Sequence, residues 1–96
     1  MQNEYMKNTN ESVEKNEREK EIELIMSIIK TKEELKDANK NFDYAGGDLI
    51  DYYTYQIKAN QAKLDYLIKI AKSRGITVDM INDIKFRLLE KNEEVG

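Results

Sequence analysis

The sequence contains no cysteine, histidine, proline or tryptophan among its 96 residues. Without cysteine there is no disulfide framework, no thiolate nucleophile and no cysteine-ligated zinc site. Without histidine the chain lacks the commonest metal ligand and general base. Asp43, Asp48 and Asp51 flank a glycine pair, but they lack the spacing of a calcium-binding loop. We therefore expect no catalytic residue, no cofactor and no metal site.

The charges of the chain nearly balance, with 16 lysines and arginines against 19 aspartates and glutamates and a formal net charge of −3. Such a balance creates no overall field that would draw the chain onto nucleic acid or an anionic membrane. No apolar run approaches the roughly 20 residues of a membrane span, and the N-terminus lacks the apolar core of a secretory signal. We expect no membrane contact and a cytoplasmic location.

The composition and periodicity predict an all-α protein whose helices are separated at two glycine sites. At Gly46-Gly47 we expect a turn with positive φ values, followed by a helix that Asp48 caps. At Gly75 we expect the left-handed residue that ends a helix. Ile76 would then make a hydrophobic contact, and Thr77 would cap a third helix.

The two glycine sites divide the chain into three parts. Residues 1–16 are predicted to form a flexible polar tail, because their few apolar side chains form no sustained stripe. Residues 17–75 are predicted to form a long antiparallel helical hairpin. Residues 76–96 are predicted to form a shorter amphipathic helix, from about residue 78 to residue 92, with a frayed end.

The first helix, predicted from near Glu17 to Tyr44, carries apolar residues three and four positions apart, which is typical of one buried face. These residues are Ile22, Ile25, Ile28, Ile29, Leu35, Ala38 and Phe42. We interpret this face as structural.

The second helix, predicted from about Leu49 to Arg74, carries two apolar stripes on a wheel of roughly 100° per residue. The first stripe is Ile50, Tyr53, Ile57, Leu64, Ile68 and Ala71. The second stripe is Tyr52, Tyr55, Ala59, Ala62, Tyr66 and Ile70. Because the glycine turn is short, we expect the first helix to pack against the first stripe. One neighbouring helix cannot cover both stripes. We predict that the second stripe is a protein interface, where the alanines admit another helix between the phenol rings.

Other interpretations of this helix and the next stay open. The tyrosines of the second stripe would alternatively stack on a ligand or a base. Asn60 would either fix the pairing register through a buried hydrogen bond or lie at the rim of the contact. The third helix would either fold back onto the second stripe, giving a three-helix bundle, or extend the contact surface of a dimeric four-helix-type bundle.

Four runs of residues resemble one known family. They are Asn41-Phe42-Asp43-Tyr44, Asp48-Leu49-Ile50-Asp51-Tyr52-Tyr53, the segment from Ala59 to Lys69 and the segment from Ala71 to Ile76. Over residues 22–76 the chain resembles the YaaL-like family, a small domain of unknown function found in sporulating Gram-positive bacteria. The resemblance implies a helical hairpin with no assigned activity, and it carries over no catalytic residue.

We interpret the protein as a non-enzymatic protein-protein interaction module that binds a second copy of itself or a helix of another protein. This interpretation rests on the second stripe.

One alternative function is enzymatic. The segment Asn60-Gln61-Ala62-Lys63-Leu64-Asp65 resembles the Ser-Gln-x-Leu-Asp signature of small sporulation phosphatases, which remove phosphate from aspartyl-phosphate in response regulators. It has Asn in place of Ser and one extra residue before Leu-Asp. In that interpretation Gln61 would position a water molecule and Asp65 would orient it.

A further alternative is weak nucleic-acid binding by the basic residues that gather late in the second helix. These residues are Lys58, Lys63, Lys69, Lys72 and Arg74. On a helical wheel these residues lie on more than one face of the helix. Lysine and arginine in the last turns of a helix also have a structural role, because their positive charge interacts favourably with the helix dipole. We therefore favour a protein partner over nucleic acid.

Overall fold

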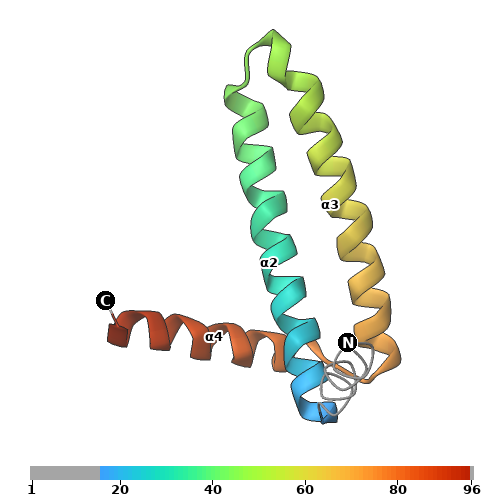
Figure 1. The fold of residues 1–96 in the computed structure, drawn as a ribbon, viewed down its shortest axis with the longest axis vertical. Helices are drawn as coiled ribbons and strands as arrows, with labels where there is room; N and C mark the ends of the chain where they lie inside the picture. Colours follow the sequence, from blue (N-terminus) through green and yellow to red (C-terminus); the bar gives the residue numbers. More distant parts are fainter. Residues whose placement is uncertain (1–15, 96) are drawn as a thin grey trace, which may run out of the picture.

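The computed structural model describes residues 16–95, with side chains described as far as Lys91. Its three helices are α2 (Glu17–Tyr44), α3 (Gly47–Ser73) and α4 (Val78–Val95). Figure 1 shows α2 and α3 as an antiparallel hairpin, and α4 crossing the hairpin at the end opposite its turn. The all-α prediction is confirmed. Except for Asn16, the predicted polar tail lies outside the described residues.

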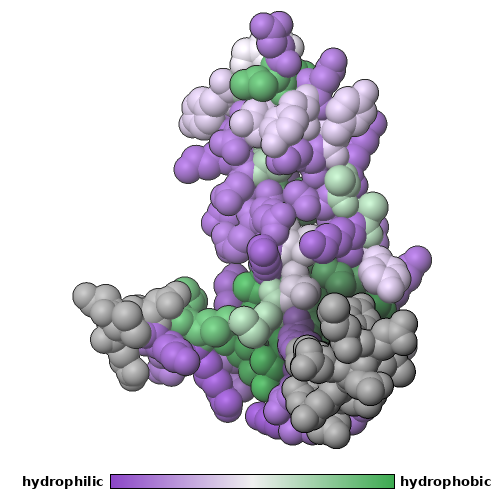
Figure 2. All heavy atoms as spheres, viewed as in Figure 1, coloured by the Kyte–Doolittle hydropathy of each residue, from purple (hydrophilic) through white to green (hydrophobic). Residues whose placement is uncertain are grey.

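The hydrophobic core lies where the open end of the hairpin meets α4. Its buried members are Ile25, Ile28, Leu67, Ala71 and Ile76. Half-buried residues pack against them, namely Leu24, Ile29, Leu64, Ile81 and Ile84. In Figure 2 most of the green, hydrophobic spheres gather at this end of the molecule. The core therefore joins α2, α3, α4 and the connection between α3 and α4.

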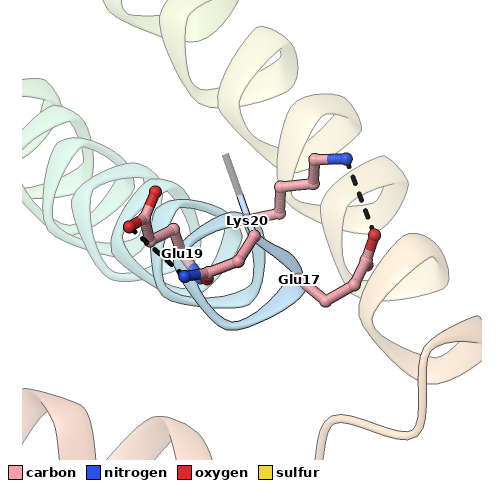
Figure 3. Close-up of polar contacts among 4 residues, drawn as sticks. Glu17, Glu19 and Lys20 are labelled. Carbon is pink, nitrogen blue, oxygen red and sulfur yellow. Dashed lines mark hydrogen bonds and ion pairs between the residues drawn. The ribbon is translucent and has the colours of Figure 1, made fainter. Parts of the chain in front are cut away.

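α2 begins at Asn16, whose side chain caps the helix. Asn16 Oδ1 accepts a hydrogen bond from the Glu19 backbone N–H at 2.8 Å, and Asn16 Nδ2 donates to Glu19 Oε1 at 3.4 Å. Asn16 and Glu19 occupy the two positions of a capping box, but the Glu19 carboxylate accepts from the Asn16 side-chain amide and not from its backbone N–H. Lys20 Nζ lies 3.6 Å from Glu17 Oε1 (Figure 3). Asn16 is therefore part of the helix boundary and not of a flexible tail.

The turn between α2 and α3 differs from the prediction. Gly46 has φ −77° and ψ 171°, and Gly75 is the one described glycine with positive φ. Gly46, not Asp48, is the N-cap of α3, and Asp48 lies in the first helical turn. The two residues between the helices, Ala45 and Gly46, both have an extended backbone, and they are enough to reverse the chain. α3 therefore begins at Gly47 rather than at Leu49.

The turn between α3 and α4 has the predicted form. Gly75 has φ 73°, and the Ile76 N–H donates to the Ala71 carbonyl at 3.0 Å, as in a Schellman motif. Ile76 makes the predicted hydrophobic contact, since its side chain is part of the core. Thr77 Oγ1 accepts a hydrogen bond from the Met80 N–H at 3.2 Å and so caps α4.

α4 packs against α2 and does not run alongside α3 (Figure 1). Met80 and Ile84 of α4 line a shallow pocket together with Ile22 and Ile25 of α2. The sequence left open whether the third helix covers the second stripe of α3. In this structure it does not.

Three positions in the hairpin depart from the predicted buried faces. Phe42 on α2 and Ile50 on α3 are both exposed, because they lie near the hairpin turn, far along the chain from the core. Thr31 was not predicted to be buried, yet it is only 1% exposed. Its hydroxyl donates to the Ser27 carbonyl at 2.7 Å, which satisfies the polar atom within α2.

Replacing Ile28, a fully buried core residue, by Ala should lower the free energy of unfolding by about 2–5 kcal/mol, because it leaves a cavity between the helices. Urea denaturation followed by circular dichroism measures this loss. Met26→Ala is the matched control, since Met26 lies on the exposed face of the same helix, and it should change stability by no more than about 0.5 kcal/mol. Equal losses in the two variants would contradict the assigned core.

Gly75→Ala should lower the free energy of unfolding by about 1 kcal/mol, because only the backbone conformation opposes the new side chain. A Cβ at Gly75 would meet nothing within 4 Å. Gly47→Ala should instead leave stability unchanged or raise it by up to about 1 kcal/mol, because Gly47 is helical and a Cβ there also meets nothing within 4 Å. Thermal melting of both variants checks the opposite signs.

Candidate functional site

The predicted interface residues lie on one side of α3, apart from its core contacts with α2, and we call them the outer stripe; Ala59 also borders the groove between the two helices. They are Tyr52, Tyr55, Ala59, Ala62, Tyr66 and Ile70. The residues of α3 that pack toward α2 recur in steps of three and four, and they include Leu64, Leu67 and Ala71. On a helical wheel the outer stripe lies roughly 125° from that line of contacts. α3 therefore presents two separate apolar faces.

Most of the outer stripe is open to solvent. The exposed fractions of Tyr52, Tyr55 and Tyr66 are 52%, 69% and 64%. Ala59 and Ala62 are also exposed, whereas Ile70 is half-buried. Exposed aromatic residues that flank exposed alanines form a surface with a shallow centre and large side chains on both sides. Such a shape fits a helix that approaches closely over the alanines.

Contacts within α3 hold the first tyrosine of the outer stripe in place. The Tyr52 ring meets the Tyr53 ring edge to face, with centroids 5.0 Å apart and an interplanar angle of 72°. Tyr52 Oη also accepts a hydrogen bond from Gln56 Nε2 at 2.8 Å. These contacts reduce the freedom that the side chain would lose on binding.

A row of charged residues runs beside the outer stripe, and we call it the charged row. It consists of Asp51, Lys58, Asp65 and Lys72. All four side chains are exposed, and none makes an ion pair with another residue of the described chain. Their signs alternate at intervals of seven residues. The interface prediction did not include this row, although its spacing is visible in the sequence.

An open groove of about 240 Å³ lies on the other side of the outer stripe, between α2 and α3. Its lining is Glu34, Asp37, Ala38, Asn41, Gln56, Ala59 and Asn60. Asn60 is half-buried there and makes no hydrogen bond to any other described residue. Of the two roles predicted for this amide, the geometry favours the rim position over a register-fixing hydrogen bond.

The residues of the two alternative functions are dispersed on exposed surface. Gln61 and Asp65 are both exposed, and the groove between α2 and α3 includes neither of them. Lys58, Lys69 and Lys72 are exposed as well, and so are Lys63 and Arg74. Lys72 additionally lines a small apolar pocket with Lys32 of α2, a proximity that the sequence pattern did not indicate.

Within residues 16–95 no group of three or more acidic, cysteine or histidine side chains is placed to hold a metal ion. Over the same range no helix has the length and apolarity needed to cross a membrane.

Comparison with known proteins gives one match. A family model described as a protein of unknown function, DUF2508, matches residues 6–78. No curated protein and no solved structure matches the chain.

Asn60→Leu should raise the free energy of unfolding by about 1 kcal/mol, because a half-buried amide without a hydrogen bond is replaced by an apolar side chain against α2. Gln61→Leu, at the neighbouring exposed position, should change it by less than about 0.5 kcal/mol. Urea denaturation of both variants measures the difference. A loss of stability in Asn60→Leu would instead assign the amide a register-fixing role.

Proposed function

The chain belongs to the DUF2508 family, whose description assigns no activity, and we propose that it is a non-enzymatic protein-protein interaction module. Its mechanism is helix recognition on the outer stripe of α3. The observation that carries the proposal is the path of α4, which crosses α2 and leaves the outer stripe open. Contiguous exposed apolar surface of this kind is typical of interaction sites.

The side chains of the outer stripe suit contact with another helix. Ala59 and Ala62 let a second backbone approach, as small residues do where helices pack closely. Tyr55 and Tyr66 stand on either side of them, and each ring buries a large apolar area while its hydroxyl stays in contact with water. Tyrosine is enriched in protein interfaces for this reason.

The alternative functions have weaker support. A phosphatase-like role rests on Gln61 and Asp65, which lie on exposed surface away from the groove between the helices. Nucleic-acid binding rests on lysines that share their faces of α3 with Asp51 and Asp65. The proposal includes a cytoplasmic location in a sporulating Gram-positive bacterium, which rests on the YaaL-like resemblance and not on the fold.

Incorporating a photo-reactive benzophenone amino acid at Tyr55 should give a covalent adduct with a second polypeptide in living cells, because that side chain lies in the proposed contact. Adding Ala62→Trp should abolish the adduct, since a bulky ring at the shallow centre prevents close approach of a helix. Gel mobility and mass spectrometry of the adduct provide the measurement.

Two controls make this experiment specific. The same photo-reactive residue at Lys36, which is exposed on α2, should give no adduct. Gln61→Trp, which adds the same bulk outside the outer stripe, should leave the Tyr55 adduct intact. An adduct that survives Ala62→Trp, or no adduct at Tyr55, would contradict helix recognition on this surface.

A further inference from the structure

We propose that the occupant of the outer stripe is a second copy of this chain, packed antiparallel about a two-fold axis between Asn60 and Gln61. The inference rests on the proposed function, because it names the partner of the same surface. Three properties of α3 support it: the symmetry of the outer stripe, the order of signs in the charged row, and the apolar residues on the opposite flank.

Four of the six residues of the outer stripe are arranged symmetrically about the proposed axis, whereas Tyr52 and Ile70 have no counterpart within the stripe. Tyr55 and Tyr66 are equally distant from it along the sequence, and so are Ala59 and Ala62. An antiparallel second α3 therefore places Tyr55 opposite the partner's Tyr66 and Ala59 opposite the partner's Ala62. The alanines allow the closest approach at the centre, and the tyrosines fill the space on either side. A surface that is complementary to itself in this way is what a two-fold dimer requires.

The charged row is complementary to itself in the same register. In an antiparallel helix pair, residues on one flank of the contact face the same flank of the partner. Asp51 then meets the partner's Lys72, and Lys58 meets the partner's Asp65. The two-fold axis repeats each pair, so that all four charges of each protomer meet the opposite sign. No described residue of the same chain competes for these charges.

The flank of the contact that lies away from the charged row carries an apolar residue near each end of the outer stripe, Leu49 and Ile70. Leu49, in the first turn of α3, is half exposed and is not part of the hydrophobic core. The antiparallel register brings Leu49 next to the partner's Ile70. The contact therefore covers an apolar side chain that is half exposed in the isolated chain.

A parallel pairing of the same stripes lacks this complementarity. It sets Lys58 beside the partner's Lys63, which is repulsive, and it sets Asp51 beside the partner's Gln56. Asp65 would face the partner's Ile70, so no acid–base pair would form. The charges thus select the antiparallel orientation.

The path of α4 leaves room for this dimer. α4 extends from the α2 side of the hairpin, so it does not stand in front of the outer face of α3 (Figure 1). The resulting assembly sets the two hairpins side by side in the order α2, α3, partner's α3, partner's α2. It differs from a four-helix bundle in that its α2 helices do not share one central core.

Two double variants of the full chain test the register. Lys58→Glu with Lys72→Glu makes the charged row entirely acidic, and Asp51→Lys with Asp65→Lys makes it entirely basic. Each variant alone should self-associate on the order of 100-fold more weakly than the wild type, because every pair across the axis becomes repulsive. An equimolar mixture should regain wild-type affinity as a heterodimer, in which all the pairs have opposite signs.

Light scattering behind size exclusion over a range of concentrations measures the association, and native mass spectrometry identifies the heterodimer. Lys36→Glu with Lys40→Glu, two reversals at exposed positions of α2, is the control with the same change in net charge, and it should stay dimeric. Because an unfolded variant cannot regain the dimer on mixing, recovery also shows that both variants fold.

Two results would overturn the proposal. A wild-type chain that is monomeric at about 100 µM excludes a second copy as the occupant; helix recognition of another protein would still stand if the Tyr55 adduct forms. A wild-type dimer that neither row variant weakens, or whose variants do not recombine, excludes the antiparallel register. Failure of the Tyr55 adduct, in contrast, removes the outer stripe as a contact for any protein.

Discussion

The left-handed residue Gly75 and the buried side chain beside it control where α4 lies. Gly75 ends α3 with φ 73°, and Ile76 joins Ile28 and Ala71 in the core. With Ile76 held there, the chain leaves the hairpin on the α2 side, and α4 packs across the beginning of α2 instead of returning along α3. The outer stripe stays open because of this one turn.

The open stripe connects stability with function. A chain of this size buries a smaller fraction of its surface than a larger domain does, and helices draw most of their stability from packing. One face of α3 packs against α2, whereas the outer stripe exposes Tyr52, Tyr55 and Tyr66 to water. Covering that stripe with another helix would add apolar burial to the chain as well as form the proposed contact.

Local signals in the sequence were sufficient for part of the fold. The bounds of α2 and the Gly75 turn depend on residues within a few positions of each other, and both match the prediction. At Gly46 the same kind of reasoning failed, because a glycine and an aspartate are both good N-caps and differ little in free energy. The path of α4 depends on contacts with α2, which is far away in the sequence. The hydrophobic periodicity of α3 therefore located the outer stripe but could not show whether α4 covers it. That the stripe binds a protein remains a prediction.

Because the chain has no cysteine, a single spin label can be placed on each protomer, and the distance between the two labels tests the antiparallel contact of α3 most directly. Labels at Gln61→Cys should lie within roughly 20 Å of each other, since they flank the axis of two helices in contact. Labels at Asp43→Cys, near the hairpin turn, should lie roughly 40 Å apart or more, because each residue advances a helix by 1.5 Å. Pulsed electron resonance measures both distances. Labels at residue 43 that lie closer together than those at residue 61, or no coupling at either position, would contradict the account.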